Sequence, residues 1–175
     1  MNKFYLFFIF LFTVNSLSAK VLISPVDAMK ENYAQSTVIE KKRLTLSAEQ
    51  KKQIQHSAKV KLRSKQYTVY IAKKNKETLG YGILINKKVR SKNAVILYII
   101  ANDTLQSIEI IAFNEPHEYL PSKEWQKQFK SRSTNTMLQL SSEIPNITGA
   151  TLSAKSVIES SRIAFALYNN FLKGK

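Results

Sequence analysis

The chain has 175 residues, with 27 Lys and Arg against 12 Asp and Glu, and it contains no cysteine. This length suits one domain with short appendages, and the lack of cysteine excludes disulfides, thiolate metal sites and cysteine nucleophiles. The net charge of +15 favours an anionic partner such as a membrane surface or an acidic redox protein, but a well-solvated lysine-rich surface is the simpler explanation.

Residues 1–19 have the layout of a secretory signal peptide. A short basic start that includes Lys3 precedes an almost wholly apolar run over residues 4–14, and small residues follow it. The apolar run is too short to span a membrane comfortably, although an uncleaved N-terminal anchor is the alternative. We therefore expect a periplasmic or otherwise extracytoplasmic protein after cleavage, with no nucleic-acid partner.

Residues 20–62 are predicted to form an N-terminal helical segment. Pro25 suits an early helical position, and apolar side chains follow it at helical spacing. Ser47, followed three residues later by Gln50, is the signature of a capping box. This box is expected to begin a second helix over residues 48–59.

Residues 63–175 are predicted to form one domain of the α+β class. Its first half is rich in β-branched and aromatic residues, and Asn102-Asp103 is a typical hairpin turn. Short connections between strands indicate a four-stranded antiparallel sheet flanked by helices. Gly80 and Gly82 lie within a strand and indicate a bulge, or the close approach of a ligand or another backbone segment. The expected strands are residues 66–72, 78–85, 94–101 and 105–113.

The loop after the sheet contains a small cluster of ionisable side chains, Glu115, His117 and Glu118. Such residues can serve acid–base chemistry or bind a metal, but a polar loop without this role is the simpler interpretation. A short helix follows, with Trp125 and Phe129 four residues apart on one face. The chain has no nucleophile elbow, Walker-type loop or dinucleotide-binding fingerprint.

The stretch 143–153 leads into the last predicted element, a long amphipathic helix over residues 153–173 with Ser153 as its cap. Gly149 allows a tight turn just before this helix. A helix N-terminus has unpaired N–H groups and a positive dipole end, so it suits phosphate. The stretch is therefore either a phosphate-holding turn or a plain entry into the helix.

The run Asn-Ile-Thr-Gly-Ala-Thr-Leu-Ser at residues 146–153 resembles the flavinylation motif of the FMN-binding domain family. That family includes the C subunit of the sodium-translocating NADH:quinone reductase, the G subunit of the Rnf complex and small periplasmic proteins with covalent FMN. In it, a flavin transferase uses FAD and Mg²⁺ to attach FMN by a phosphoester to the last Thr of the motif. The resemblance implies that Thr151 carries FMN, and the order of elements is similar from about residue 27 to 172.

Residues around the motif are the candidates for contact with the cofactor and for recognition by its transferase. Family members usually have an acidic residue shortly before the modified Thr, and this chain has Pro145 at the common spacing and Glu143 two residues earlier. Trp125, Phe129 and Tyr81 are candidates for packing on the isoalloxazine ring, although an ordinary core position is the simpler explanation for each. The expected cofactor-binding residues are Thr148, Gly149, Ala150, Thr151, Leu152, Ser153 and Trp125.

These observations predict an exported flavoprotein that transfers electrons and has no independent catalytic activity. A separate flavin transferase would mature it, and a membrane or periplasmic redox partner would exchange electrons with it. Pro145 supports an alternative, a flavin-free binding module of the same fold held at a membrane or partner surface by its basic charge. A metal-dependent hydrolase built on Glu115, His117 and Glu118 is a third possibility.

Overall fold

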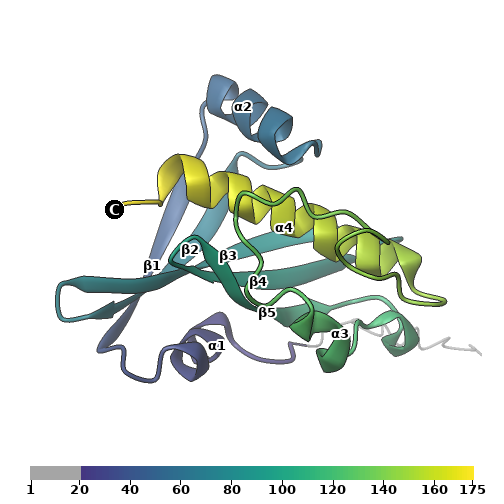
Figure 1. Cartoon of the computed structure of the whole chain (residues 1–175), viewed down its shortest axis with the longest axis horizontal. Coiled ribbons are helices and arrows are strands. Elements are labelled where there is room, and N and C mark those ends of the chain that lie inside the picture. Colours follow the sequence, from purple (N-terminus) through teal and green to yellow (C-terminus); the bar gives the residue numbers. More distant parts are fainter. Residues whose placement is uncertain (1–20) are drawn as a thin grey trace, which may run out of the picture.

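The computed structural model describes residues 21–175, so the expected signal peptide at 1–19 lies outside the described residues. The helices are α1 (Pro25–Asn32), α2 (Ala48–Ala58), α3 (Lys123–Lys127) and α4 (Thr151–Phe171), with a 3-10 turn η1 (His117–Tyr119). The strands are β1 (Val38–Thr45), β2 (Gln66–Lys74), β3 (Glu77–Lys88), β4 (Asn93–Ala101) and β5 (Thr104–Phe113). Figure 1 shows their arrangement.

The strands form one five-stranded antiparallel sheet in the order β1-β2-β3-β4-β5. The predicted α+β class, with an antiparallel sheet flanked by helices and a long C-terminal helix, is confirmed. The predicted number of four strands is wrong, because β1 lies within the segment 20–62 that was expected to be helical. Most of β1 is exposed and it carries a run of charges, so its strand character comes from pairing with β2 and leaves little pattern in the sequence.

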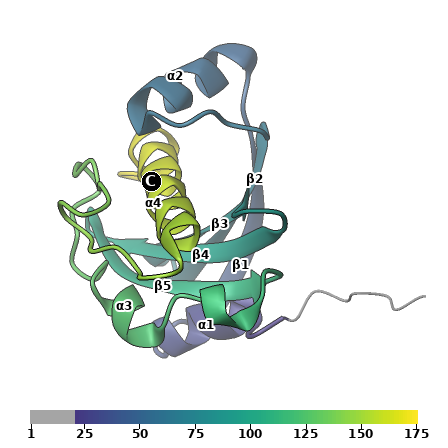
Figure 2. The same cartoon turned by 90° about the vertical axis from the view of Figure 1, so that its right-hand side faces the viewer.

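The helices cover the two faces of the sheet unequally (Figures 1 and 2). Helix α4 crosses one face and α2 lies beyond it, and together they bury the larger of two apolar clusters. Helix α1 lies on the opposite face and buries the smaller cluster. None of the helices within residues 21–175 is long and apolar enough to cross a membrane.

Two glycines of β3 allow α1 to lie against the sheet. A Cβ atom at Gly80 would overlap the hydroxyl of Tyr33, and one at Gly82 would lie 2.5 Å from the Met29 Sδ atom. The pairing of β2 with β3 also shifts register between Ala72 and Lys73, close to Gly80. The expected irregularity in strand pairing is therefore present, and the closest approach is made by the side chains of Tyr33 and Met29 instead of a ligand or another backbone segment.

Two local predictions about turns and caps are confirmed. Ser47 and Gln50 form the reciprocal capping box at the start of α2. Asn102 and Asp103 make the turn between β4 and β5, each with a positive φ, at 49° and 59°.

The start of α4 differs from the prediction. The helix begins at Thr151, its N-cap is Ala150, and no side chain caps it. Gly149, with φ at +78°, turns the chain, and the Ala154 N–H donates the first helical hydrogen bond to the Ala150 carbonyl at 3.1 Å. Ser153 is therefore the third residue of the helix instead of its cap.

Candidate functional site

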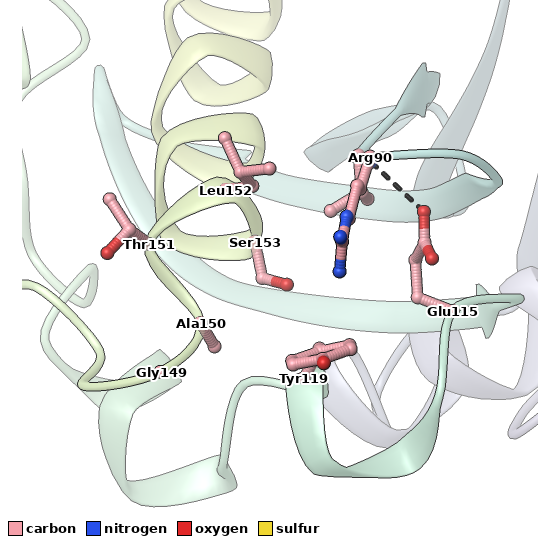
Figure 3. Close-up of a pocket in the computed structure, with 9 residues that line it drawn as sticks. Arg90, Glu115, Tyr119, Gly149, Ala150, Thr151, Leu152 and Ser153 are labelled. Atoms are coloured by element: carbon pink, nitrogen blue, oxygen red, sulfur yellow. Dashed lines mark hydrogen bonds between the residues drawn. The ribbon is translucent and has the colours of Figure 1, made fainter.

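A pocket of about 220 Å³ lies where three segments meet: the start of α4, the loop between β3 and β4, and η1 with the residues before it (Figure 3). The sequence analysis singled out the first segment for phosphate binding and the third, through Glu115, for acid–base or metal chemistry, but it did not bring the two together. The pocket is lined by Val89, Arg90, Glu115, Tyr119, Gly149, Ala150, Thr151, Leu152 and Ser153.

The backbone at the start of α4 presents unpaired donors to this region. The N–H groups of Thr151, Leu152 and Ser153 have no hydrogen-bond acceptor among residues 21–175. The first turn also contains no acidic side chain that would neutralise the positive end of the helix dipole. An anion placed here would gain hydrogen bonds as well as a favourable field.

Ser153 places its side-chain hydroxyl in the same pocket. Its residue is only 1 % exposed, and Figure 3 shows the hydroxyl pointing into the pocket space. No hydrogen bond joins this hydroxyl to another group in the described part of the chain. The hydroxyl opens onto the pocket and is free to donate, so this position suits a ligand that offers an acceptor.

Thr151 presents its hydroxyl differently. The residue is exposed, and its side chain lies on the opposite side of the helix start from Arg90 (Figure 3). The Asn146 Nδ2 group donates a hydrogen bond to Thr151 Oγ1 at 3.0 Å. This contact orients the hydroxyl and leaves it accessible. Thr148, also exposed, lies outside the residues that line the pocket.

Glu115 uses its carboxylate to hold the β3–β4 loop. Its Oε1 atom accepts backbone N–H bonds from Arg90 at 3.0 Å, Ser91 at 2.6 Å and Lys92 at 2.7 Å, and its Oε2 atom accepts the Ser91 hydroxyl at 3.1 Å. Together these bonds hold the pKa of Glu115 below its ordinary value, and the bond from the Lys92 N–H contributes most. Burial of the carboxylate opposes this shift. The carboxylate is therefore an ionised structural anchor.

The other two members of the ionisable cluster do not join Glu115. His117 and Glu118 lie in η1 and are exposed. Within residues 21–175, no group of three or more His, Cys, Asp and Glu side chains is arranged to hold a metal ion.

Arg90 and Tyr119 are pocket residues that sequence reasoning missed. Figure 3 shows the Arg90 guanidinium directed into the space between Ser153 and Tyr119. No carboxylate of the described chain forms an ion pair with this guanidinium. Nothing in the sequence separates Arg90 from the other basic residues near it, whereas Tyr119 could have been suspected from its place beside the acidic loop.

The aromatic residues proposed to pack on a flavin lie elsewhere. Trp125 is 7 % exposed, donates its indole N–H to the Pro145 carbonyl at 2.8 Å and packs edge-on against Phe129. Tyr81 donates its hydroxyl to the Lys175 carbonyl at 2.6 Å. None of the three lines the pocket.

Glu143 and Pro145, the two positions considered for the acidic residue of the motif, both accept hydrogen bonds from neighbouring segments. Glu143 Oε2 accepts the Gln139 N–H at 2.9 Å, and its carbonyl accepts a bond from Arg132 at 3.0 Å. The Pro145 carbonyl accepts the Trp125 indole. Glu143 therefore stabilises its own loop, and Trp125 contacts the segment just before the motif through the Pro145 carbonyl.

Comparison with known proteins adds no assignment, since neither a protein-family model nor a curated protein matches this chain. The chemistry of the pocket and of Thr151 is thus the basis for a functional inference.

Proposed function

We propose that this protein is an exported flavoprotein that carries FMN on Thr151 through a phosphoester and serves as an electron carrier. The observation that carries the proposal is the start of α4. There an accessible hydroxyl occupies the first position of a helix whose leading N–H groups are free.

The donors around the pocket fit a phosphate group. The free N–H groups, the Ser153 hydroxyl and the Arg90 guanidinium all donate hydrogen bonds, and two of these features also carry positive charge or potential. The nearby Glu115 carboxylate does not oppose an anion strongly, because backbone N–H groups already compensate it.

The rest of the lining fits a planar ring. Val89, Tyr119, Ala150 and Leu152 supply an apolar surface, and Leu152 is 49 % exposed. The volume of about 220 Å³ is smaller than the roughly 300–1,000 Å³ of pockets that bury most of a ligand. A flavin held here would keep part of its ring accessible, which suits exchange of electrons with another protein.

The chain supplies an acceptor hydroxyl and a separate transferase supplies the chemistry of attachment. The bond from Thr151 Oγ1 to phosphorus forms as the pyrophosphate bond of FAD breaks, AMP leaves, and the hydroxyl proton passes to a base of the transferase. Asn146 Nδ2 occupies one acceptor site of the hydroxyl, so the proton stays free to leave. Bound FMN would supply the redox chemistry, while the protein sets its orientation and potential. The basic surface would favour a membrane or an acidic redox partner.

Thr151→Ala is the direct test of this proposal. We expect the wild-type chain, co-expressed with an active flavin transferase, to gain the mass of one FMN less water and to fluoresce after denaturing electrophoresis. Thr151→Ala should lose both signals completely. Thr45→Ala, which removes an exposed hydroxyl of β1 far from the motif in sequence and outside the pocket, is the matched control and should keep them.

An unmodified mass for the wild-type chain would contradict the proposal, provided that the transferase modifies a known substrate in the same cells. If that colourless protein then bound anionic vesicles in a salt-dependent manner, the flavin-free binding module would be the better description.

A further inference from the structure

We propose that Arg90, Ser153 and the start of α4 form an oxyanion site that binds the phosphate of a flavin nucleotide before any bond to Thr151 exists, with Glu115 as the residue that positions Arg90. The identity of the ring rests on the proposed function. The oxyanion site itself does not, since inorganic phosphate tests it separately.

The first element of the site is a cation without an internal partner. Arg90 lies just beyond the end of β3, and its guanidinium is directed into the pocket (Figure 3). No ion pair within the described residues includes Arg90, so its charge is available to an anionic ligand. Its planar fork matches the oxygens of phosphate especially well.

The second element is Ser153, which makes the start of α4 more than a bare helix end. The residue is only 1 % exposed, and its hydroxyl makes no hydrogen bond within residues 21–175 and points toward the same space as Arg90 (Figure 3). The hydroxyl and the free N–H groups of the helix therefore converge with the guanidinium. A tetrahedral oxyanion can satisfy donors that arrive from two directions.

The third element is the loop that presents Arg90. One carboxylate oxygen of Glu115 accepts three consecutive backbone N–H groups, beginning with that of Arg90 at 3.0 Å. This fixes the backbone from which the guanidinium extends, while leaving the guanidinium itself unpaired. Glu115 lines the pocket, and its role in the site is to position Arg90 through the loop backbone.

The consequence is a preference for phosphorylated flavin. Arg90 and Ser153 would hold the phosphate beside the helix start, where Thr151 also lines the pocket although its hydroxyl lies on the side away from Arg90 (Figure 3). Riboflavin has the same ring without the phosphate, so it should bind weakly.

The test uses the chain produced without a flavin transferase, so that every interaction is non-covalent. Binding of FMN and riboflavin is measured by quenching of flavin fluorescence and by calorimetry, and inorganic phosphate is added as a competitor. We expect FMN to bind at least about tenfold more tightly than riboflavin, and phosphate to displace it. Arg90→Gln should weaken FMN binding about tenfold or more, and Ser153→Ala about threefold.

The controls separate this site from general charge. Arg43→Gln removes the same charge from the exposed part of β1 and should leave FMN binding unchanged. Glu115→Gln should weaken FMN binding in the wild-type background but add nothing further in the Arg90→Gln background, as expected for a positioning residue. Circular dichroism establishes that each variant is folded, and the decisive variant, Arg90→Gln, alters an exposed side chain.

Equal affinity for riboflavin and FMN would overturn the inference, as would equal affinity of Arg90→Gln and Arg43→Gln for FMN. Absence of FMN binding by the wild-type chain at millimolar concentration would also overturn it. These outcomes are distinguishable from failure of the proposed function. A chain that is flavinylated but insensitive to Arg90→Gln rejects only the oxyanion site, whereas a chain that binds FMN but is never modified rejects only the covalent carrier.

Discussion

Helices α2 and α4 begin in opposite ways. At the start of α2, the Ser47 hydroxyl accepts the Gln50 N–H at 3.1 Å and the Gln50 side chain accepts the Ser47 N–H at 2.8 Å. At the start of α4, Ala150 provides no side-chain acceptor and the leading N–H groups remain free. The first arrangement stabilises a helix, whereas the second leaves donors for a ligand, and natural chains accept such a local cost mainly at functional sites.

The loop between β3 and β4 binds an anion that the protein itself supplies, the carboxylate of Glu115. Glu115 satisfies three backbone N–H groups there, as a ligand would do at the start of α4. The two sets of donors lie on opposite sides of one pocket (Figure 3). One set has its anion built in and the other does not.

Removing the Glu115 carboxylate should have the largest effect on stability. Glu115→Ala leaves three backbone donors without their acceptor, so the free energy of unfolding should fall by about 3 kcal/mol. Urea unfolding followed by circular dichroism measures the change. Glu118→Ala, an exposed neighbour, is the control and should lie within about 0.5 kcal/mol of wild type. An equally small change for Glu115→Ala would show that the loop does not depend on the carboxylate.

The same anchor predicts a dependence on pH. Because the bonds lower the pKa of Glu115 in the folded chain, its stabilisation is complete above the unfolded-state pKa and is lost as pH falls through the folded-state value. Glu115→Gln should therefore show a smaller loss of stability on acidification than wild type. A Glu40→Gln variant tests the separate contribution of Glu40, whose pKa is lowered mainly by its hydrogen bond with Lys73.

Breaking the cap of α2 should have a smaller effect. Ser47→Ala removes the acceptor for the Gln50 N–H and should cost about 1 kcal/mol of stability. Binding of FMN or phosphate should not change, because α2 does not line the pocket. A loss of FMN affinity in this variant would mean that the two helix starts are not independent.

Adding a negative charge to the start of α4 should give the smallest change in stability, but with the opposite sign. Leu152→Glu places a carboxylate in the first turn at an exposed position, so it should stabilise the helix by about 0.5 kcal/mol. It should also repel phosphate and weaken FMN binding. Leu152→Gln removes the same apolar surface without charge and is the matched control. If both variants bound FMN equally, the field at the helix start would not contribute to recognition.

The features that the sequence alone determined are those with local causes. The capping box of α2, the Asn102-Asp103 turn and the amphipathic pattern of α4 depend on residues within a few positions of one another. The small-residue turn before Thr151 belongs to the same class. For this reason the general α+β architecture and one wall of the pocket were predictable.

The remaining features required contacts between distant segments. Strand β1 carries an exposed, charged pattern and becomes a strand by pairing with β2. Ser153 lies in the pocket as the third residue of α4, because the turn at Gly149 and Ala150 lets the helix begin at Thr151. Arg90, Glu115 and Tyr119 meet α4 only when the sheet brings the β3–β4 loop beside η1. Hydrogen bonds and burial across such separations leave no periodic trace in the sequence, so tertiary structure alone decided the opposite wall of the pocket.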